Sequence, residues 1–309
     1  MRSGQGFPQG VTVFERGWLS SNSILMQGGA GTAVVDTGYA LHAGQTVALV
    51  RQALNGRPLG AILNTHLHSD HCGGNAALQG VYPDLLTSIP PGLADAVARW
   101  DEVALTYRPT GQRCDRFGFN SVLLPGKTVP LADGEWEIHA APGHDPHSVI
   151  LFDPASRTLI SADALWENGF GVVFPELEGE SGFSEVAATL DLIESLQPRW
   201  IIPGHGSVFP GERLATSLAA ARSRLEGFVR DPARHARHAV KVLLKFKLLE
   251  LQSTSTASLM SWAQQTPYFM LVFGRYFNDQ EASSWVHSLV LDLVKSGAAR
   301  VEGQLIVNS

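Results

Sequence analysis

The sequence predicts an α/β protein, with a catalytic domain at residues 1–212 and a smaller, mainly helical domain at residues 213–309. Three observations support this fold class. Short apolar runs alternate with helical patterns in the first two thirds of the chain, several of these runs end in turns that carry His or Asp, and the pattern becomes mainly helical after Pro210. A chain of 309 residues is long enough for one large and one smaller domain.

The composition is that of a folded protein, with 44% hydrophobic and 17% charged residues. A formal net charge of −6 gives no overall attraction to nucleic acid or to an anionic membrane. The segment Met1–Gly10 lacks the apolar core of a signal peptide, and no apolar run reaches transmembrane length. Two cysteines are too few for a disulfide framework. We therefore expect a cytoplasmic enzyme with reduced thiols and no membrane partner.

The first strands are predicted at residues 11–14, 23–26 and 32–35, where apolar runs are separated by Gly, Ser and Asn. The third run ends in Asp36-Thr37-Gly38. A carboxylate at that position can orient a metal-binding side chain, or it can accept hydrogen bonds within the turn. Both interpretations of Asp36 remain open at this point.

A helix is predicted over Leu41–Leu54 from its apolar spacing, followed by a buried strand at Ala61–Leu63. The strand leads into Thr65–Gly74, which reads Thr-His-Leu-His-Ser-Asp-His-Cys-Gly-Gly. Imidazole and carboxylate groups are the ligands of zinc and related metals. The chain must turn to use them all, and the paired glycines favour that turn. The metal-ligand candidates in this segment are His66, His68, Asp70 and His71.

The same arrangement recurs later in the chain. The strand predicted at 136–140 is followed by a turn with His144, the strand at 158–161 by Asp163, and the strand at 200–202 by His205, with a helix at 184–196 before the last. Seven ligand candidates are enough for two divalent metal ions. The simplest allocation gives His66, His68 and His144 to the first ion and Asp70, His71 and His205 to the second, with Asp163 between them.

The order His-x-His-x-Asp-His at residues 66–71, followed by His144, Asp163 and His205, resembles the signature of the metallo-β-lactamase superfamily. The resemblance covers roughly residues 11–210 and implies a four-layer αβ/βα sandwich with a binuclear metal site. Oxygen-reducing diiron members carry a carboxylate where His68 stands, so the resemblance favours hydrolysis. The pattern is closer to glyoxalase-II-like thioesterases, lactonases and phosphodiesterases than to antibiotic-hydrolysing members, which usually lack the aspartate at position 163.

The resemblance also suggests a mechanism, in which a metal-bridging hydroxide attacks the substrate and Asp70 orients it or carries its proton. His147 either donates a proton to the leaving group or packs the turn. Trp166 and Phe170 either form an apolar wall for an acyl group or belong to the core. Zinc is the expected metal, and the donor set also accepts iron and manganese. We expect a small ester, thioester or lactone as the substrate.

The last hundred residues predict helices at 213–229, 233–251, 253–263 and 280–296, and a hairpin at 299–307, an order similar to a winged-helix appendage. Eight Lys and Arg residues against two acids lie between Arg222 and Lys247. This basic segment is either a solvated helix face or a phosphate-binding surface, which would suit a phosphodiesterase or ribonuclease, or a non-catalytic nucleic-acid-binding regulator. A dimer or lid element is a further alternative.

Overall fold

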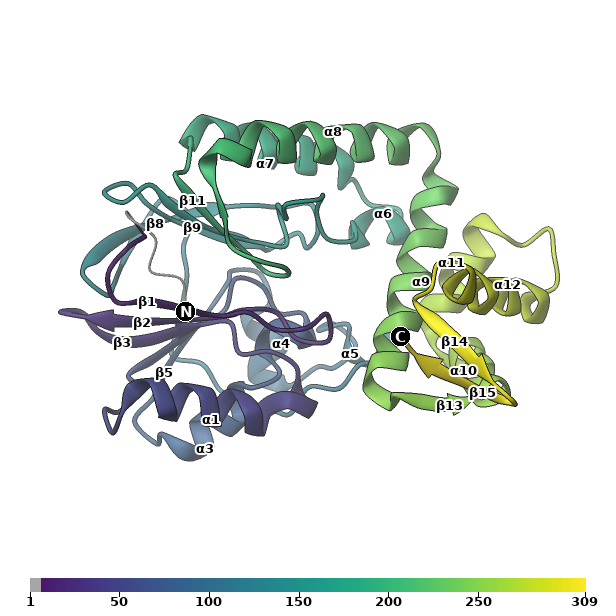
Figure 1. The fold of residues 1–309 in the computed structure, drawn as a ribbon, viewed down its shortest axis with the longest axis horizontal. Coiled ribbons are helices and arrows are strands. Elements are labelled where there is room, and N and C mark those ends of the chain that lie inside the picture. The colour runs from purple at the N-terminus through teal and green to yellow at the C-terminus, as the bar shows by residue number, and fades with distance from the viewer. Residues whose placement is uncertain (1–6) are drawn as a thin grey trace.

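A computed structural model describes residues 7–309. Most of the segment Met1–Gly10, for which no signal peptide was expected, therefore lies outside the described residues. The first two thirds of the chain form four layers, in which two sheets lie face to face and helices cover the outer face of each sheet (Figure 1). This arrangement confirms the predicted α/β class and the four-layer sandwich.

The first sheet has the strand order β1-β2-β3-β4-β5-β6. Its first three strands pair antiparallel, as hairpin-linked runs do, and β3 to β6 pair in parallel because helical segments connect them. The elements are β1 (Val11–Phe14), β2 (Ser23–Gly28), β3 (Gly31–Val35), a 3-10 turn (Ala40–His42), α1 (Ala43–Leu54), β4 (Ala61–Leu63), α2 (Ser69–Cys72), α3 (Asn75–Val81), β5 (Leu86–Ile89), α4 (Ala94–Arg99), α5 (Tyr107–Thr110) and β6 (Ser121–Val122).

The second sheet has the order β12-β11-β10-β9-β8-β7, and only β10 and β11 pair in parallel. The connection between those two strands passes through helix α7, as a parallel pair requires. The elements are β7 (Thr128–Leu131), β8 (Gly134–Ala140), β9 (Val149–Asp153), β10 (Thr158–Ala162), α6 (Phe174–Glu178), α7 (Phe183–Leu196), β11 (Trp200–Pro203), β12 (Phe209–Pro210), a second 3-10 turn (Gly211–Arg213) and α8 (Leu214–Arg230).

The space between the sheets is filled by aliphatic side chains from both, among them Met26 and Leu63 of the first sheet and Ile138 and Leu151 of the second. Alternate residues of a strand face opposite sides, so each sheet offers one face to this core and one to its helices. The sandwich therefore holds the ends of both sets of strands in fixed relation. That relation decides which strand-end side chains can meet.

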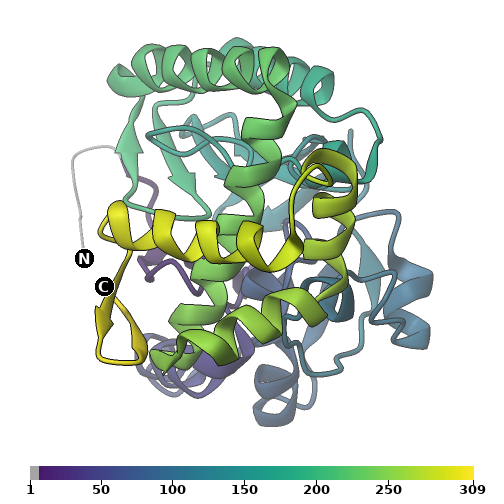
Figure 2. The same cartoon turned by 90° about the vertical axis from the view of Figure 1, so that its right-hand side faces the viewer.

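The C-terminal part consists of α9 (Pro232–Leu251), β13 (Ser253–Ser255), α10 (Thr256–Gln265), α11 (Pro267–Tyr276), α12 (Ala282–Lys295), β14 (Ala299–Glu302) and β15 (Leu305–Asn308). Its three strands form a small sheet in the order β13-β15-β14. Figure 2 shows its helices packed beside the sandwich, with α9 as the element that connects the two parts. A helix, a strand, further helices and a hairpin follow one another as in a winged helix, and membership of that class stays a prediction.

Two details of the C-terminal part differ from the sequence expectations. Residues 253–255 form strand β13 rather than the start of a helix, and α11 was not expected at all. Side chains of α8, such as Leu218 and Leu225, belong to the hydrophobic cluster of the second sheet, so α8 packs with the sandwich. The predicted domain boundary at residues 212–213 assigns α8 to the C-terminal domain, and it stays a prediction. Among the described residues, no helix is both long and apolar enough to span a membrane.

Candidate metal centre

The seven predicted ligand side chains meet beyond the ends of four strands. The segment after β4 of the first sheet carries His66, His68, Asp70 and His71, while loops after β8, β10 and β11 of the second sheet carry the other three. Since the two sheets face each other, these strand ends lie together although the residues span almost 140 positions. The loop residues are His144, Asp163 and His205.

The first group of donors consists of His66, His68 and His144, whose nearest ligand atoms all lie within 4.8 Å of one another. His68 Nδ1 and His144 Nε2 are 2.7 Å apart. On the far side of the His144 ring, Nδ1 donates a hydrogen bond to the carbonyl oxygen of Val172. That bond fixes the tautomer, so the Nε2 lone pair of His144 points toward the other two histidines.

The second group consists of Asp70, His71 and His205. His205 Nε2 lies 3.0 Å from Asp70 Oδ2, and His71 Nε2 lies 3.9 Å from the same oxygen. Asp70 and His71 share the short helix α2, so one turn of backbone places both side chains. This group is the one allocated to the second ion from the sequence.

Asp163 lies between the two groups. Its Oδ1 is 3.4 Å from His71 Nε2, and its Oδ2 is 3.4 Å from His144 Nε2. Two ligand atoms of a tetrahedral zinc ion are about 3.3 Å apart, given metal–ligand bonds of about 2.0–2.1 Å. The buried Nε2 atoms of His66 and His71 also have no hydrogen-bond partner among the described residues. The donor set therefore fits two divalent ions that share one carboxylate.

Asp36 orients one of these ligands from behind. Its Oδ2 accepts a hydrogen bond from His71 Nδ1 at 2.8 Å, and its carboxylate also accepts from the backbone and side chain of Thr65. Because a carboxylate only accepts, His71 must carry a proton on Nδ1, so Nε2 is the nitrogen that faces the centre and could bind a metal ion. Both alternatives raised from the sequence therefore apply, since Asp36 also secures the turn.

Burial and neighbouring charges set the protonation of the centre. Burial lowers the pKa of His66 well below its usual value and that of His68 to about 4, so both imidazoles are neutral at pH 7. Burial alone would lower the pKa of His71, but the carboxylates of Asp163, Asp36 and Asp70 raise it well above its usual value, so His71 is a cation before a metal ion binds. That cation in turn holds the pKa of Asp163 well below its ordinary range, although burial alone would raise it. A metal ion would displace the Nε2 proton of His71. Neutral imidazoles and ionised carboxylates are the forms that bind a metal ion.

Close backbone approach explains three glycines around the centre. A Cβ at Gly204 would lie 2.1 Å from Asp163 Oδ1, so only glycine leaves room for that carboxylate. Gly73 and Gly74 have helical φ angles of −63° and −86°, which any residue adopts. A Cβ at either would lie 2.4 Å from backbone atoms of the segment after β3. The chain does turn at this pair, between α2 and α3, but glycine is needed there for the tight packing of two segments rather than for the backbone angles.

The three predicted substrate residues lie in three different environments. Trp166 is half-buried, donates from Nε1 to Asp163 Oδ1 at 3.2 Å, and places its ring edge-on against His205. Phe170 is 1% exposed and packs in the core under α8, so the expectation that it forms a substrate wall is corrected. Its ring meets that of Phe228 edge-to-face with centroids 6.3 Å apart, so the hydrophobic core surrounds it instead of the metal centre. The ring of His147 packs against the backbone of Gly92.

Three residues at the centre were not predicted. Trp18 is 58% exposed and stacks on His205 with ring centroids 5.4 Å apart. Phe174 places its ring edge toward His68 at 5.0 Å, and Asp145 Oδ2 lies 3.8 Å from His68 Nε2. Asp145 directly follows His144 in the sequence and could have been suspected. Trp18 and Phe174 lie far from any ligand motif in the chain, so no local signal marks them.

Comparisons with known proteins find similar sequences over the part of the chain that carries these residues. A family model described as the metallo-beta-lactamase superfamily matches residues 16–205. A hydroxyacylglutathione hydrolase of Anaeromyxobacter dehalogenans (strain 2CP-C) is 30% identical over 212 residues, which cover 66% of this chain and 69% of that protein. A hydroxyacylglutathione hydrolase of Synechococcus sp. (strain JA-3-3Ab) is 31% identical over 119 residues. The chain spans only 40% of the length of that second relative.

Two solved structures extend the comparison. TTHA1623 in a di-iron-bound form is 27% identical, with a TM-score of 0.54, and the match covers 67% of this chain and 98% of that one. The metallo-beta-lactamase family protein TTHA1429 from Thermus thermophilus is 18% identical, with a TM-score of 0.54. That match covers 98% of this chain and 99% of the other, so the fold likeness includes the C-terminal part.

Proposed function

This chain belongs to the metallo-β-lactamase superfamily, and within it we propose a metal-dependent hydrolase that cleaves a small ester, thioester or lactone. The observation that carries the proposal is the pair of donor groups joined by Asp163. Three ligands of its own and the shared carboxylate would give each ion four protein donors, and expansion to five ligands, which catalytic zinc allows, would admit a water molecule or the substrate. The hydroxyacylglutathione hydrolases among the relatives support an acyl substrate.

Two divalent ions bound here would lower the pKa of water toward about 7 and polarise the oxygen of the bond to be cleaved. We propose zinc, for which a histidine-rich donor set is typical, and the same donors also accept iron. His66, His68 and His144 would hold one ion and Asp70, His71 and His205 the other, with Asp163 shared.

Asp70 is the residue proposed to handle the proton of the attacking water. Its side chain is 13% exposed, against 6% for Asp163, so it is the more accessible of the two ligand carboxylates. Its Oδ2 faces His205 Nε2, which leaves a second oxygen to accept a hydrogen bond. Asp70 can therefore orient a water molecule at the centre, as the sequence predicted.

Aromatic rings give the site an apolar rim. Trp18 and Trp166 meet edge-to-face with centroids 5.4 Å apart, and both lie against His205. On the other side of the centre, Phe174 contacts the rings of His68 and His144. We propose that the acyl part of the substrate packs between these two sides, since aromatic faces supply large apolar area at small conformational cost.

The test compares hydrolysis of an acyl thioester and of a phosphodiester by the metal-loaded protein, with His144→Ala as the control. We expect thioester cleavage that falls at least about a hundredfold in the control, because one ion loses a ligand. If the loaded protein cleaves no ester, thioester or lactone, the proposal fails.

A second candidate is a phosphodiesterase of the same superfamily. The observation in its favour is a basic cavity beside α8 and α9, which is described below. A rate on the phosphodiester that exceeds the rate on the thioester, and is lost in His144→Ala, would select this candidate instead.

A further inference from the structure

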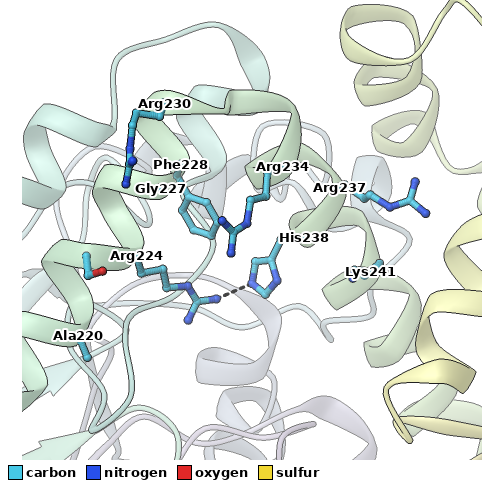
Figure 3. A pocket seen from close by; sticks show the side chains of 10 residues that line it. Ala220, Arg224, Gly227, Phe228, Arg230, Arg234, Arg237, His238 and Lys241 are labelled. Carbon is cyan, nitrogen blue, oxygen red and sulfur yellow. Dashed lines mark hydrogen bonds between the residues drawn. The ribbon is translucent and has the colours of Figure 1, made fainter.

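A cavity of about 770 Å³ lies between helices α8 and α9 (Figure 3). None of the seven ligand side chains is among the residues that line it. Its volume is in the range of small-molecule sites, which are typically about 300–1,000 Å³. No Asp or Glu is among the residues that line it. The ionisable side chains that line it are Arg224, Arg230, Arg234, Arg237, His238 and Lys241.

Most of the positive charge in this cavity has no acidic partner. Asp292 of α12 accepts from Arg237 at 2.9 Å and lies 3.6 Å from Lys241. Among the described residues, Arg224, Arg230 and Arg234 form no ion pair. Three uncompensated guanidinium groups around one cavity repel one another, unless an anion or solvent ions separate them.

Arg224 is held in place by the protein itself. Its guanidinium lies over the rings of Phe170 and Phe228, at 5.6 and 5.4 Å from their centroids. Its Nη2 donates to His238 Nε2 at 2.7 Å, as Figure 3 shows. Burial and the nearby arginine lower the pKa of His238 to about 3, so this imidazole is neutral and accepts the bond. A cation positioned by a neutral partner keeps its charge available to a ligand.

We propose that this cavity binds a small molecule that carries two or more phosphate groups, at a site separate from the metal centre. Guanidinium groups match phosphate oxygens in paired hydrogen bonds, and several of them together need a ligand with several charges. The cations line a cavity between two helices rather than an extended stripe, and the chain is acidic overall. Both facts favour a compact phosphorylated ligand over a nucleic-acid backbone, which needs a long basic surface.

The cavity adjoins the loop that follows Asp163. A Cβ at Gly169 would lie 2.6 Å from Arg224 Nη1, so this guanidinium packs directly on the loop backbone. The same loop carries Trp166 at the metal centre, and Trp166 and Gly169 form a bridge within it. A ligand that moves Arg224 would therefore also shift the loop that places Trp166 at the metal centre. Binding itself does not depend on which reaction the centre performs.

The experiment is a calorimetric titration of the metal-loaded protein with inorganic pyrophosphate. We expect one cavity site per chain, with a Kd that rises at least about tenfold in Arg230→Gln/Arg234→Gln, because two charged partners are lost. Both side chains are exposed, so this variant should fold. Arg224→Gln is a second variant that removes the half-buried cation, with its melting temperature as a check on folding.

Two controls make the result decisive. Arg51→Gln/Arg99→Gln removes the same charge from exposed helix positions elsewhere and should leave the Kd unchanged. His144→Ala should also leave cavity binding intact, which separates this site from pyrophosphate bound at the metal ions. An unchanged Kd in Arg230→Gln/Arg234→Gln would overturn the proposal, as would complete loss of binding in His144→Ala. A single-stranded oligonucleotide that binds more tightly than pyrophosphate, and depends on the same arginines, would overturn the choice of a small ligand.

Discussion

Asp36 is the residue whose position most directly links the first sheet to the metal centre. It follows β3 with a left-handed backbone (φ +55°), and this conformation brings its carboxylate to His71 Nδ1 and to the backbone of Thr65. A non-glycine residue in that region carries strain, which the surrounding hydrogen bonds offset. Strain of this kind is typical of functional sites.

Replacing Asp36 with Asn should weaken the metal group that contains His71. The amide keeps the shape but removes the charge that fixes the imidazole, and such changes typically cost about 10–100-fold in metal affinity. The measurement is metal content per chain after dialysis against a graded chelator. Asp153→Asn is the matched control, because Asp153 is a buried carboxylate that also secures a turn, at Ala155 and Ser156. Equal metal retention in both variants would contradict the assigned role of Asp36.

Gly204 precedes the ligand His205, and it leaves no room for even one methyl group beside Asp163 Oδ1. Gly204→Ala should therefore displace the shared carboxylate and reduce hydrolysis by at least about a hundredfold, since a 1 Å misplacement has costs of that order. The measurement is the rate of the metal-loaded variant, with circular dichroism to confirm the fold. Gly118→Ala is the control, because a Cβ there meets nothing within 4 Å. Full activity of Gly204→Ala would show that the carboxylate can move freely.

Among the elements, α9 connects the sandwich to the C-terminal helices through a buried histidine. His235 Nε2 accepts a hydrogen bond from the backbone N–H of Val173, and its ring packs against Phe183 and Phe228. Burial and the nearby Arg224 lower the pKa of His235 to about 4. The neutral form thus holds α9 against the segment that follows Phe170.

The lowered pKa of His235 predicts loss of stability in mild acid. Between pH 6.5 and about 4 the unfolded chain binds a proton at this position and the folded chain does not, so the free energy of unfolding falls as pH falls. The expected slope from this group is about 1.4 kcal/mol per pH unit across that window, with no contribution above it. Urea unfolding at pH 7 and pH 5 measures it.

The matched variant for this prediction is His235→Gln, which keeps a hydrogen-bond acceptor but does not titrate. Its free energy of unfolding should change less between pH 7 and pH 5 than that of the unsubstituted chain. His287→Gln, on the exposed side of α12, should behave like the unsubstituted chain. The same pH dependence in all three proteins would show that His235 does not carry the effect.

At the scale of the whole molecule, the C-terminal helices and the sandwich share a hydrophobic cluster. Leu177 of α6 is fully buried in the cluster of α9 to α12, beside Phe269 and Trp285. The hydroxyl group of Tyr268 also donates to Glu178 at 2.9 Å. It lies 3.3 Å from the carbonyl oxygen of Phe174, whose ring contacts His68. The two parts of the chain therefore support each other next to the centre.

Leu177→Ala should lower the free energy of unfolding by about 2–5 kcal/mol, through lost burial and the cavity left behind. Because the cluster includes both parts of the chain, calorimetry should show one transition at a lower temperature rather than two. Leu124→Ala is the control, since Leu124 is 52% exposed and its loss should cost little. Separate unfolding of the C-terminal helices, with the sandwich transition unchanged, would contradict the shared cluster.

The sequence alone determined the nature of the site, because ligand chemistry depends on residue type and on position at strand ends. Regular apolar runs predicted β4, β8, β10 and β11 to within a few residues. The His and Asp residues that follow these strands are the predicted metal donors. The allocation of donors to two ions stays a prediction from the sequence, and the structure brings together the two donor groups that it names.

Only the tertiary structure decided what surrounds those donors, because side-chain direction and long-range contacts are not encoded in local spacing. Trp166 and Phe170 stand four residues apart in one loop, yet one contacts the metal centre and the other lies in the core. Trp18 reaches His205 from the opposite end of the sandwich domain's sequence. The basic cavity likewise exists because α8 and α9 pack side by side, which places arginines of both helices around one space.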